Sequence, residues 1–241
     1  MAYYSAEEAK QKLIDELGED FGNDLNYLKD SYLNMRVSWR FYRSLFGNNK
    51  ETIDLLNSVS GIFFRYIEQA LFEQTILGLC RLTDPIEIGK GAKAKKNLTY
   101  RMLEEYLPEG YICAVYVEKL EAVKELGAFA RDWRNRRIAH SDYQVIRGES
   151  ELDEASRKSV QNLLDAIGDL LQFIYQHILH SDILLETTLP LSDEITFLEH
   201  LYDASIERGR IAALNEAAVS EKRYKDYIDG PVYPKWLGGN N

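Results

Sequence analysis

The sequence is poor in cysteine. Cys80 and Cys113 are the two cysteines among 241 residues, and they form no C-x-x-C pair. A disulfide framework or a cysteine zinc site needs more thiols than this. We therefore expect both to be reduced residues of the core, where free cysteine is most often found.

Proline and long apolar runs are also scarce. The first of five prolines is Pro85, so the opening third of the chain holds no proline that would break a helix. The start, MAYYSAEEAKQKL, lacks the basic and apolar segments of a secretory signal. No uninterrupted apolar run approaches the roughly 18 residues of a membrane span. We expect a cytoplasmic protein that has no membrane partner.

Net positive charge is missing as well. The 29 Lys and Arg stand against 39 Asp and Glu, which gives a formal charge of −10 at pH 7. Such a surface argues against indiscriminate coating of nucleic acid or anionic membrane. Any polyanionic partner must therefore meet a local basic patch.

The apolar residues that are present follow helical spacing, and strand-like alternation does not persist anywhere. Ser5 and Glu8 have the spacing of a capping box for a helix that ends near Gly18. Further helices are expected at about 23–46, 51–81, 98–107, 112–139, 152–178 and 192–228. These elements predict an all-α, up-and-down helical bundle over residues 1–180. Residues 181–241 are expected to form a C-terminal helical extension, packed on the bundle or on a partner subunit.

Positive charge is concentrated in RDWRNRRIAHSDY, residues 131–143. Cations at a helix C-terminus complement the helix dipole, and this alone would account for the cluster. In a continuous helix Arg134 and His140 would lie roughly 120° apart, so either the helix loosens or the two side chains meet across chains. Arg134 also continues an apolar stripe that we interpret as a subunit contact or cleft wall; its other members are Tyr116, Leu120, Val123, Gly127 and Ala130.

The stretch RNRRIAH resembles the signature of the HEPN superfamily, in which an arginine, usually followed by a polar residue, precedes a histidine by four to six intervening positions. Arg134, Asn135 and His140 match these positions, with five residues between arginine and histidine. LFEQTILGLCRLTDP, KKNLTY and RNRRIAHSD are similar in order and spacing to HEPN proteins of abortive-infection phage defence. The resemblance covers about residues 25–180.

This resemblance implies a metal-independent endoribonuclease, the effector or toxin of a phage-defence or toxin–antitoxin system. RNA is the implied substrate, and a cognate antitoxin or regulatory protein is a further implied partner. Two protomers of a homodimer would share the cleft and leave a 2′,3′-cyclic phosphate. Arg134, Asn135 and His140 are the implied catalytic residues, and no cofactor or metal is implied.

The chemistry of the residues is consistent with that role. His140 has the side chain of a general base or acid, and Arg134 carries a permanent charge suited to a developing phosphorane. Asp142 is placed to orient the imidazole, and Tyr143 to stack on a base. Arg131, Arg136 and Arg137 are expected at the rim of the cleft, and Arg136 and Arg137 leave open which arginine is catalytic.

Other interpretations remain. A non-catalytic HEPN module would use the cluster to bind nucleotide, RNA or a partner protein as a sensor, scaffold or antitoxin. Three histidines, His177, His180 and His200, lack the carboxylates of a metal site. The loop lysines extend the basic patch or are simply solvated: Lys90, Lys93, Lys95 and Lys96. Tail residues Tyr233, Pro234 and Trp236 cover the bundle or dock on a partner.

Overall fold

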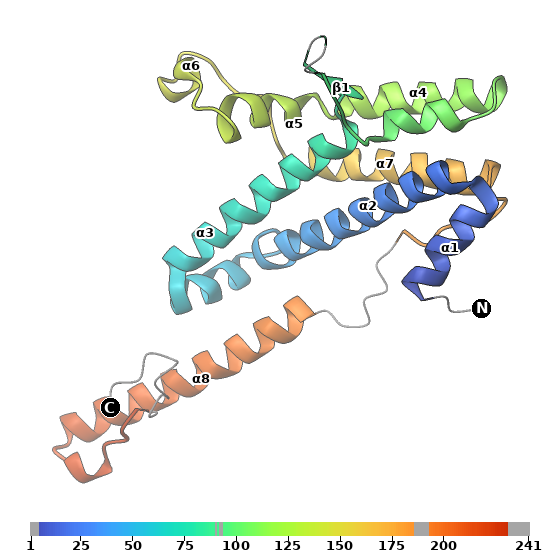
Figure 1. The fold of residues 1–241 in the computed structure, drawn as a ribbon. Helices are drawn as coiled ribbons and strands as arrows, with labels where there is room; N and C mark the ends of the chain where they lie inside the picture. The colour runs from blue at the N-terminus through green and yellow to red at the C-terminus, as the bar shows by residue number, and fades with distance from the viewer. Residues whose placement is uncertain (1–4, 90, 92–93, 186–192, 231–241) are drawn as a thin grey trace. The chain divides into compact units, whose positions relative to one another are not determined.

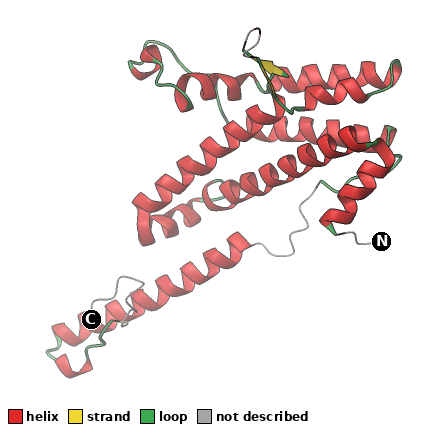
Figure 2. Ribbon diagram, viewed as in Figure 1, coloured by secondary structure: helices red, strands yellow, loops and turns green. Residues whose placement is uncertain are grey.

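The computed structural model describes residues 5–89, 91, 94–185 and 193–230, and these are almost entirely helical (Figures 1 and 2). The chain divides into two compact parts. The bundle unit comprises residues 1–48 and 65–190, and the C-terminal unit comprises residues 49–64 and 191–241. The all-α bundle with a helical extension is confirmed. Predictions for Lys90, Lys93, Ser192, Tyr233, Pro234 and Trp236 concern residues outside the described ranges.

The first two helices form a closely packed hairpin. α1 (Ala6–Leu17) begins with the predicted capping box, in which the backbone N–H of Ser5 donates to Glu8 and that of Glu8 to Ser5 Oγ. Gly18, at φ +87°, turns the chain directly into α2 (Glu19–Phe46), which begins earlier than the expected residue 23. A Cβ at Gly22 would lie 2.6 Å from Ile14 Cα, so the two backbones approach too closely for a larger residue.

The next segment departs from the prediction at three places. α3 (Lys50–Thr83) is interrupted at Ser60, whose φ of −164° and ψ of 76° are not helical. The lysine loop forms a small antiparallel hairpin of β1 (Glu87–Ile88) and β2 (Lys95–Lys96), with both lysines of β2 exposed. The segment expected as a helix at 98–107 is a 3₁₀ helix, η2 (Tyr100–Tyr106).

The helix expected at 112–139 consists of three pieces. α4 (Tyr111–Leu126) ends at Gly127, α5 (Ala128–Trp133) follows, and the π-helical turn η3 (Arg134–Ile138) completes it. The loop after His140 contains a short helix, α6 (Tyr143–Ile146). α7 (Arg157–His177) begins after the N-cap Ser156, five residues later than expected near 152.

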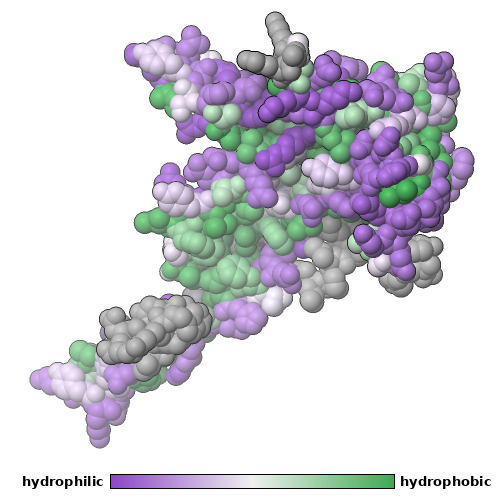
Figure 3. Space-filling view, viewed as in Figure 1, coloured by the Kyte–Doolittle hydropathy of each residue, from purple (hydrophilic) through white to green (hydrophobic). Residues whose placement is uncertain are grey.

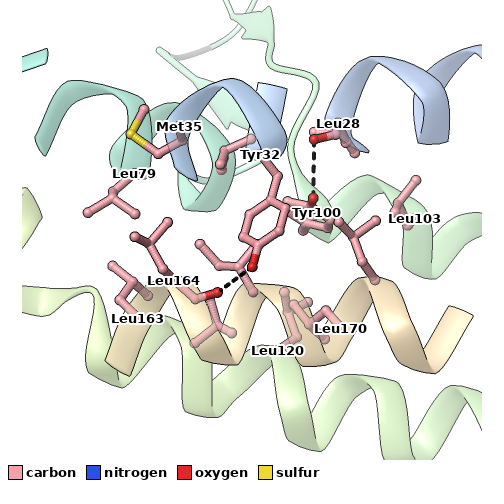
Figure 4. Packing of buried hydrophobic residues seen from close by; sticks show 14 of the residues in the cluster. Leu28, Tyr32, Met35, Leu79, Tyr100, Leu103, Leu120, Leu163, Leu164 and Leu170 are labelled. Atoms are coloured by element: carbon pink, nitrogen blue, oxygen red, sulfur yellow. Dashed lines mark hydrogen bonds between the residues drawn. The ribbon is translucent and has the colours of Figure 1, made fainter. Parts of the chain in front are cut away.

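The core of the bundle unit lies around α7, which runs between α2 and α4 (Figure 1). Two tyrosines of this core have buried hydroxyls that are hydrogen-bonded. Tyr32 donates to the Leu164 carbonyl at 3.1 Å, and Tyr100 donates to the Leu28 carbonyl at 3.2 Å (Figure 4). The stripe of Tyr116, Leu120, Val123 and Ala130 is at most 3% exposed and belongs to this core. Its interpretation as a subunit contact or cleft wall is therefore wrong, because its neighbours belong to the same chain.

The C-terminal unit pairs the first part of α3 with α8 (Asp193–Ser220), followed by the 3₁₀ turn η4 (Tyr224–Asp226). Phe64 packs on Phe197 with ring centroids 6.2 Å apart, and Leu56 and Ala218 are fully buried. α8 ends before the expected residue 228. Among the residues that are described, no helix combines the length and apolarity needed to cross a membrane.

Candidate functional site

The arginine cluster lies where the helix widens. In η3 the Ala139 N–H donates to the Arg134 carbonyl, five residues back, at 2.8 Å. The Asp142 N–H then bonds the Arg136 carbonyl at 3.0 Å as the chain turns away. The helix thus loosens before His140, which is one of the two arrangements that the sequence allowed. Single π turns of this kind are often found at functional sites.

Arg134 is anchored on the end of α3. Its guanidinium forms a charge-assisted hydrogen bond with Asp84, whose side chain is 10% exposed, and its Nε donates to Asn135 Oδ1 at 3.0 Å. Asp84 Oδ1 is buried and has no hydrogen-bond partner among the described residues. An ion pair with so little solvent fixes the guanidinium in place, since separating its partners leaves a desolvated charge.

Asp84 was not recognised from the sequence as a site residue. It is 50 positions away from Arg134, so no local spacing links the two. One signal in the sequence could have identified it. Asp84 lies near the end of LFEQTILGLCRLTDP, a stretch that resembles other HEPN proteins, and there it follows a buried helix end and precedes Pro85.

Arg136 is held by hydrogen bonds to neighbouring residues of the same chain. Its guanidinium donates to Ser150 Oγ at 2.6 Å, to the Glu151 carbonyl at 3.0 Å and to Asp132 at 3.3 Å. Its Nε also lies 3.8 Å from Asp142. These contacts tie the loop before α7 to α5.

Arg131 and Arg137 have opposite surroundings. Arg131 donates to the Lys124 carbonyl, and burial lowers the pKa of its guanidinium. Arg137 is exposed and makes no hydrogen bond or ion pair with any described residue. Of the three rim arginines, Arg137 is therefore the one whose donors all face solvent.

His140 is exposed, and its imidazole makes no hydrogen bond within the described part of the chain. Asp142 forms no hydrogen bond with this imidazole; its Oδ1 accepts the N–H groups of Gln144 and Val145 at 3.0 Å and so caps α6. Tyr143 is 67% exposed, and its hydroxyl accepts a hydrogen bond from Arg147. The surface over α5 and α6 is mainly hydrophilic, as the upper left of Figure 3 shows.

Two further side chains complete the surroundings. Cys80 is buried and interacts electrostatically with both Arg134 and Asp84, and burial raises the pKa of its thiol to about 11. Trp133 donates to the Asp153 carbonyl at 2.8 Å and packs edge-on against Phe72. Groups of three or more His, Cys, Asp or Glu suited to a metal ion are absent from the described residues.

The model of the HEPN AbiU2 family matches residues 18–204, well over half of the chain. The chain belongs to this family. HEPN AbiU2 is a HEPN-type abortive-infection family, so the resemblance derived from RNRRIAH and its neighbouring segments is confirmed. No curated protein and no solved structure matched the chain. Both Asp84 and the segment from Arg134 to His140 lie inside the region that matches the HEPN AbiU2 model.

Proposed function

We propose that the chain is a metal-independent endoribonuclease, acting as the toxic effector of a phage-defence or toxin–antitoxin system. The observation that carries the proposal is the contrast between Arg134, which is held by Asp84, and His140, which is exposed and unbonded within the described residues. A fixed cation and a free imidazole, here six residues apart in the chain, are the two groups that phosphodiester transesterification requires. Membership of an abortive-infection family gives the biological context.

In the proposed reaction His140 takes the proton of a ribose 2′-hydroxyl. The 2′-oxygen attacks the adjacent phosphorus, the bond from phosphorus to the 5′-oxygen breaks, and His140 of a second protomer returns a proton to that oxygen. Arg134 stabilises the charge of the phosphorane through its Nη2 group, which Asp84 and Asn135 leave available. The products are a 2′,3′-cyclic phosphate and a 5′-hydroxyl. Arg137 binds the flanking backbone, and a homodimer supplies the second histidine.

The test compares the wild type with His140→Ala on total RNA and a labelled oligonucleotide in EDTA. Cleavage is expected to fall at least about 100-fold, since general acid–base catalysis contributes roughly 10² to 10⁴. His200→Ala is the matched control, because His200 is an exposed helical histidine of α8. Cleavage by pure His140→Ala at the wild-type rate would contradict the proposal.

A second candidate, a non-catalytic HEPN module that binds nucleotide, RNA or a partner, is favoured by one observation. Asp84 already compensates the charge of Arg134 within the chain, as in a purely structural ion pair. This candidate predicts a folded dimer that binds RNA without cleaving it. Binding would then persist in His140→Ala and be lost in Arg134→Ala.

A further inference from the structure

The C-terminal unit has an open groove between its two helices. A cavity of about 630 Å³ lies between residues 49–58, at the start of α3, and residues 195–205 of α8. Both stretches belong to the same compact unit of the chain. The stretch of α8 is about 15 Å long at 1.5 Å per residue, so the groove can hold about three turns of another helix.

The apolar side chains that line the groove follow helical spacing. Ile195, Leu198 and Tyr202 are separated by three and four residues, so they lie on one face of α8, and Leu55 lines the groove from α3. Ile195 is 41% exposed and Tyr202 57% exposed. Ile206, one turn further along the same face, is also 57% exposed. An exposed apolar face of this kind is typical of a surface that binds another protein.

The charge that lines the groove is negative. Glu51 and Asp54 line it from α3 and Glu199 from α8, and no lysine or arginine is found among its described lining residues. All three carboxylates are exposed, and none forms a hydrogen bond or ion pair with any residue that the structure describes. These carboxylates are therefore available to the cations of another molecule.

This charge discriminates between the possible occupants of the groove. A second copy of the chain would place the same patch against itself in a two-fold interface, which would bring like charges together. RNA and anionic membranes carry the same sign of charge as the groove and are repelled by it. A helix with apolar residues along one face and lysine or arginine beside them complements both the apolar side chains and the carboxylates.

We propose that the groove between α3 and α8 binds a basic amphipathic helix of a partner protein. Apolar residues of that helix, three and four positions apart, pack on Ile195, Leu198 and Tyr202, and its lysines or arginines pair with the three carboxylates. Neither Arg134 nor His140 lines the groove, so the proposal does not depend on RNA cleavage.

The test uses two synthetic helical peptides of about 18 residues, long enough to form a helix in water. They carry the same leucines along one face and differ in the flanking residues, which are lysines in one peptide and glutamates in the other. Fluorescence anisotropy measures their binding to the full chain at physiological ionic strength. The lysine peptide is expected to bind, and the glutamate peptide to bind at least about tenfold more weakly.

The apolar contribution is tested by Ile195→Ala/Tyr202→Ala, which should weaken binding of the lysine peptide at least about tenfold. Leu214→Ala/Val219→Ala is the matched control, because these two residues are exposed apolar positions of α8 outside the groove. The control should bind the lysine peptide as the wild type does.

Charge reversal separates the groove from the general negative charge of the chain. Glu51→Lys/Glu199→Lys should reverse the preference, so that the glutamate peptide binds more tightly than the lysine peptide. Glu118→Lys/Glu216→Lys changes the net charge equally at exposed positions outside the groove, and should keep the original preference. Circular dichroism checks the fold of each variant.

Three results would overturn the proposal. The first is that the wild type binds neither peptide, or binds both equally. The second is that the two charge-reversal variants behave alike, which would assign binding to net charge alone. The third is a dimer, detected by analytical ultracentrifugation, that is lost in Ile195→Ala/Tyr202→Ala and kept in the apolar control, because the groove would then be occupied by a second copy of the chain.

Discussion

The bundle unit contains two groups of arginines that differ in what holds them. Around η3, Arg134 is paired with Asp84, and Arg136 lies within 4 Å of both Asp132 and Asp142. On α2, Arg36 and Arg43 donate instead to a phenol and an amide. The two groups therefore differ in the side chains that accept their hydrogen bonds. Carboxylates of the same chain balance the charge of Arg134 and Arg136, whereas Arg36 and Arg43 donate to neutral groups.

The two groups are connected by aromatic rings in contact. Trp39 stacks on Tyr42, Tyr42 packs on Phe72, and Phe72 packs edge-on against Trp133, which precedes Arg134. Centroid separations along this row are 5.1, 6.2 and 5.2 Å. Because both groups rest on one packed core, their variants can be compared directly in free energies of unfolding.

The largest effect on stability is expected from Asp84→Asn. The substitution leaves Arg134, whose side chain is 23% exposed, without its anion, and should lower the free energy of unfolding by about 2 kcal/mol. For a protein of this size the thermal midpoint should fall by about 4–8 °C. Asp169→Asn, at an exposed position of α7, is the control. An unchanged midpoint would mean that Arg134 does not need Asp84.

A somewhat smaller effect is expected from Arg136→Ala, which removes the bonds to Ser150, Glu151 and Asp132. The loss should be about 1.5 kcal/mol, measured by urea denaturation. Arg137→Ala is the matched control one position away, and it should stay within about 0.5 kcal/mol because Arg137 is exposed. Equal losses of unfolding free energy in the two variants would mean that the hydrogen bonds of Arg136 do not stabilise the fold.

The ionisation of Cys80 gives a measure of burial in the core close to the Arg134–Asp84 pair. Burial raises the pKa of its thiol from about 9 to about 11, so the folded state holds this proton more tightly than the unfolded state. Its contribution to stability is complete below pH 9 and is lost as the pH rises through 11, with a slope of at most about 1.4 kcal/mol per pH unit. Denaturation at several alkaline pH values should show a shallower decline for Cys80→Ala. Identical slopes would contradict this assignment.

The smallest effect is expected from Arg36→Gln/Arg43→Gln. The change in the free energy of unfolding should lie within about 0.5 kcal/mol, because relief of repulsion between cations offsets the loss of two hydrogen bonds to neutral groups. Thermal denaturation measures it. A loss above about 2 kcal/mol would mean that Arg36 and Arg43 stabilise the fold as strongly as Arg134 does, and would contradict the difference between the two groups.

Local spacing was sufficient to predict most helical segments and the buried face of α7, but not where the helices break. The capping box at Ser5 and Glu8 was confirmed, and the apolar repeat of α7 was confirmed by the burial of Val160, Leu163 and Ile167. The HEPN relationship was also recoverable, because Arg134 and His140 are close in sequence. These features depend on neighbours within a few turns of one helix.

Features that depend on tertiary packing were not predictable in the same way. The pairing of Asp84 with Arg134 needs the end of α3 to lie against η3, and the hydrogen bond from Arg43 to Gln161 needs α2 to lie against α7. The break at Ser60 had a weak local signal, since a Ser–Gly pair is one of the known causes of helix kinks. The two-residue strands of the lysine loop are too short for any alternation to show.

The π turn at Arg134–Ile138 has a consequence for how this segment tolerates changes in length. A π turn holds one residue more than an α turn between the same hydrogen-bonded groups. Deletion of one residue here is expected to restore α-helical geometry and to leave the Arg134–Asp84 pair in place. In this chain the π turn therefore lies between an anchored arginine and a solvent-facing histidine, in the stretch where the HEPN signature varies in length.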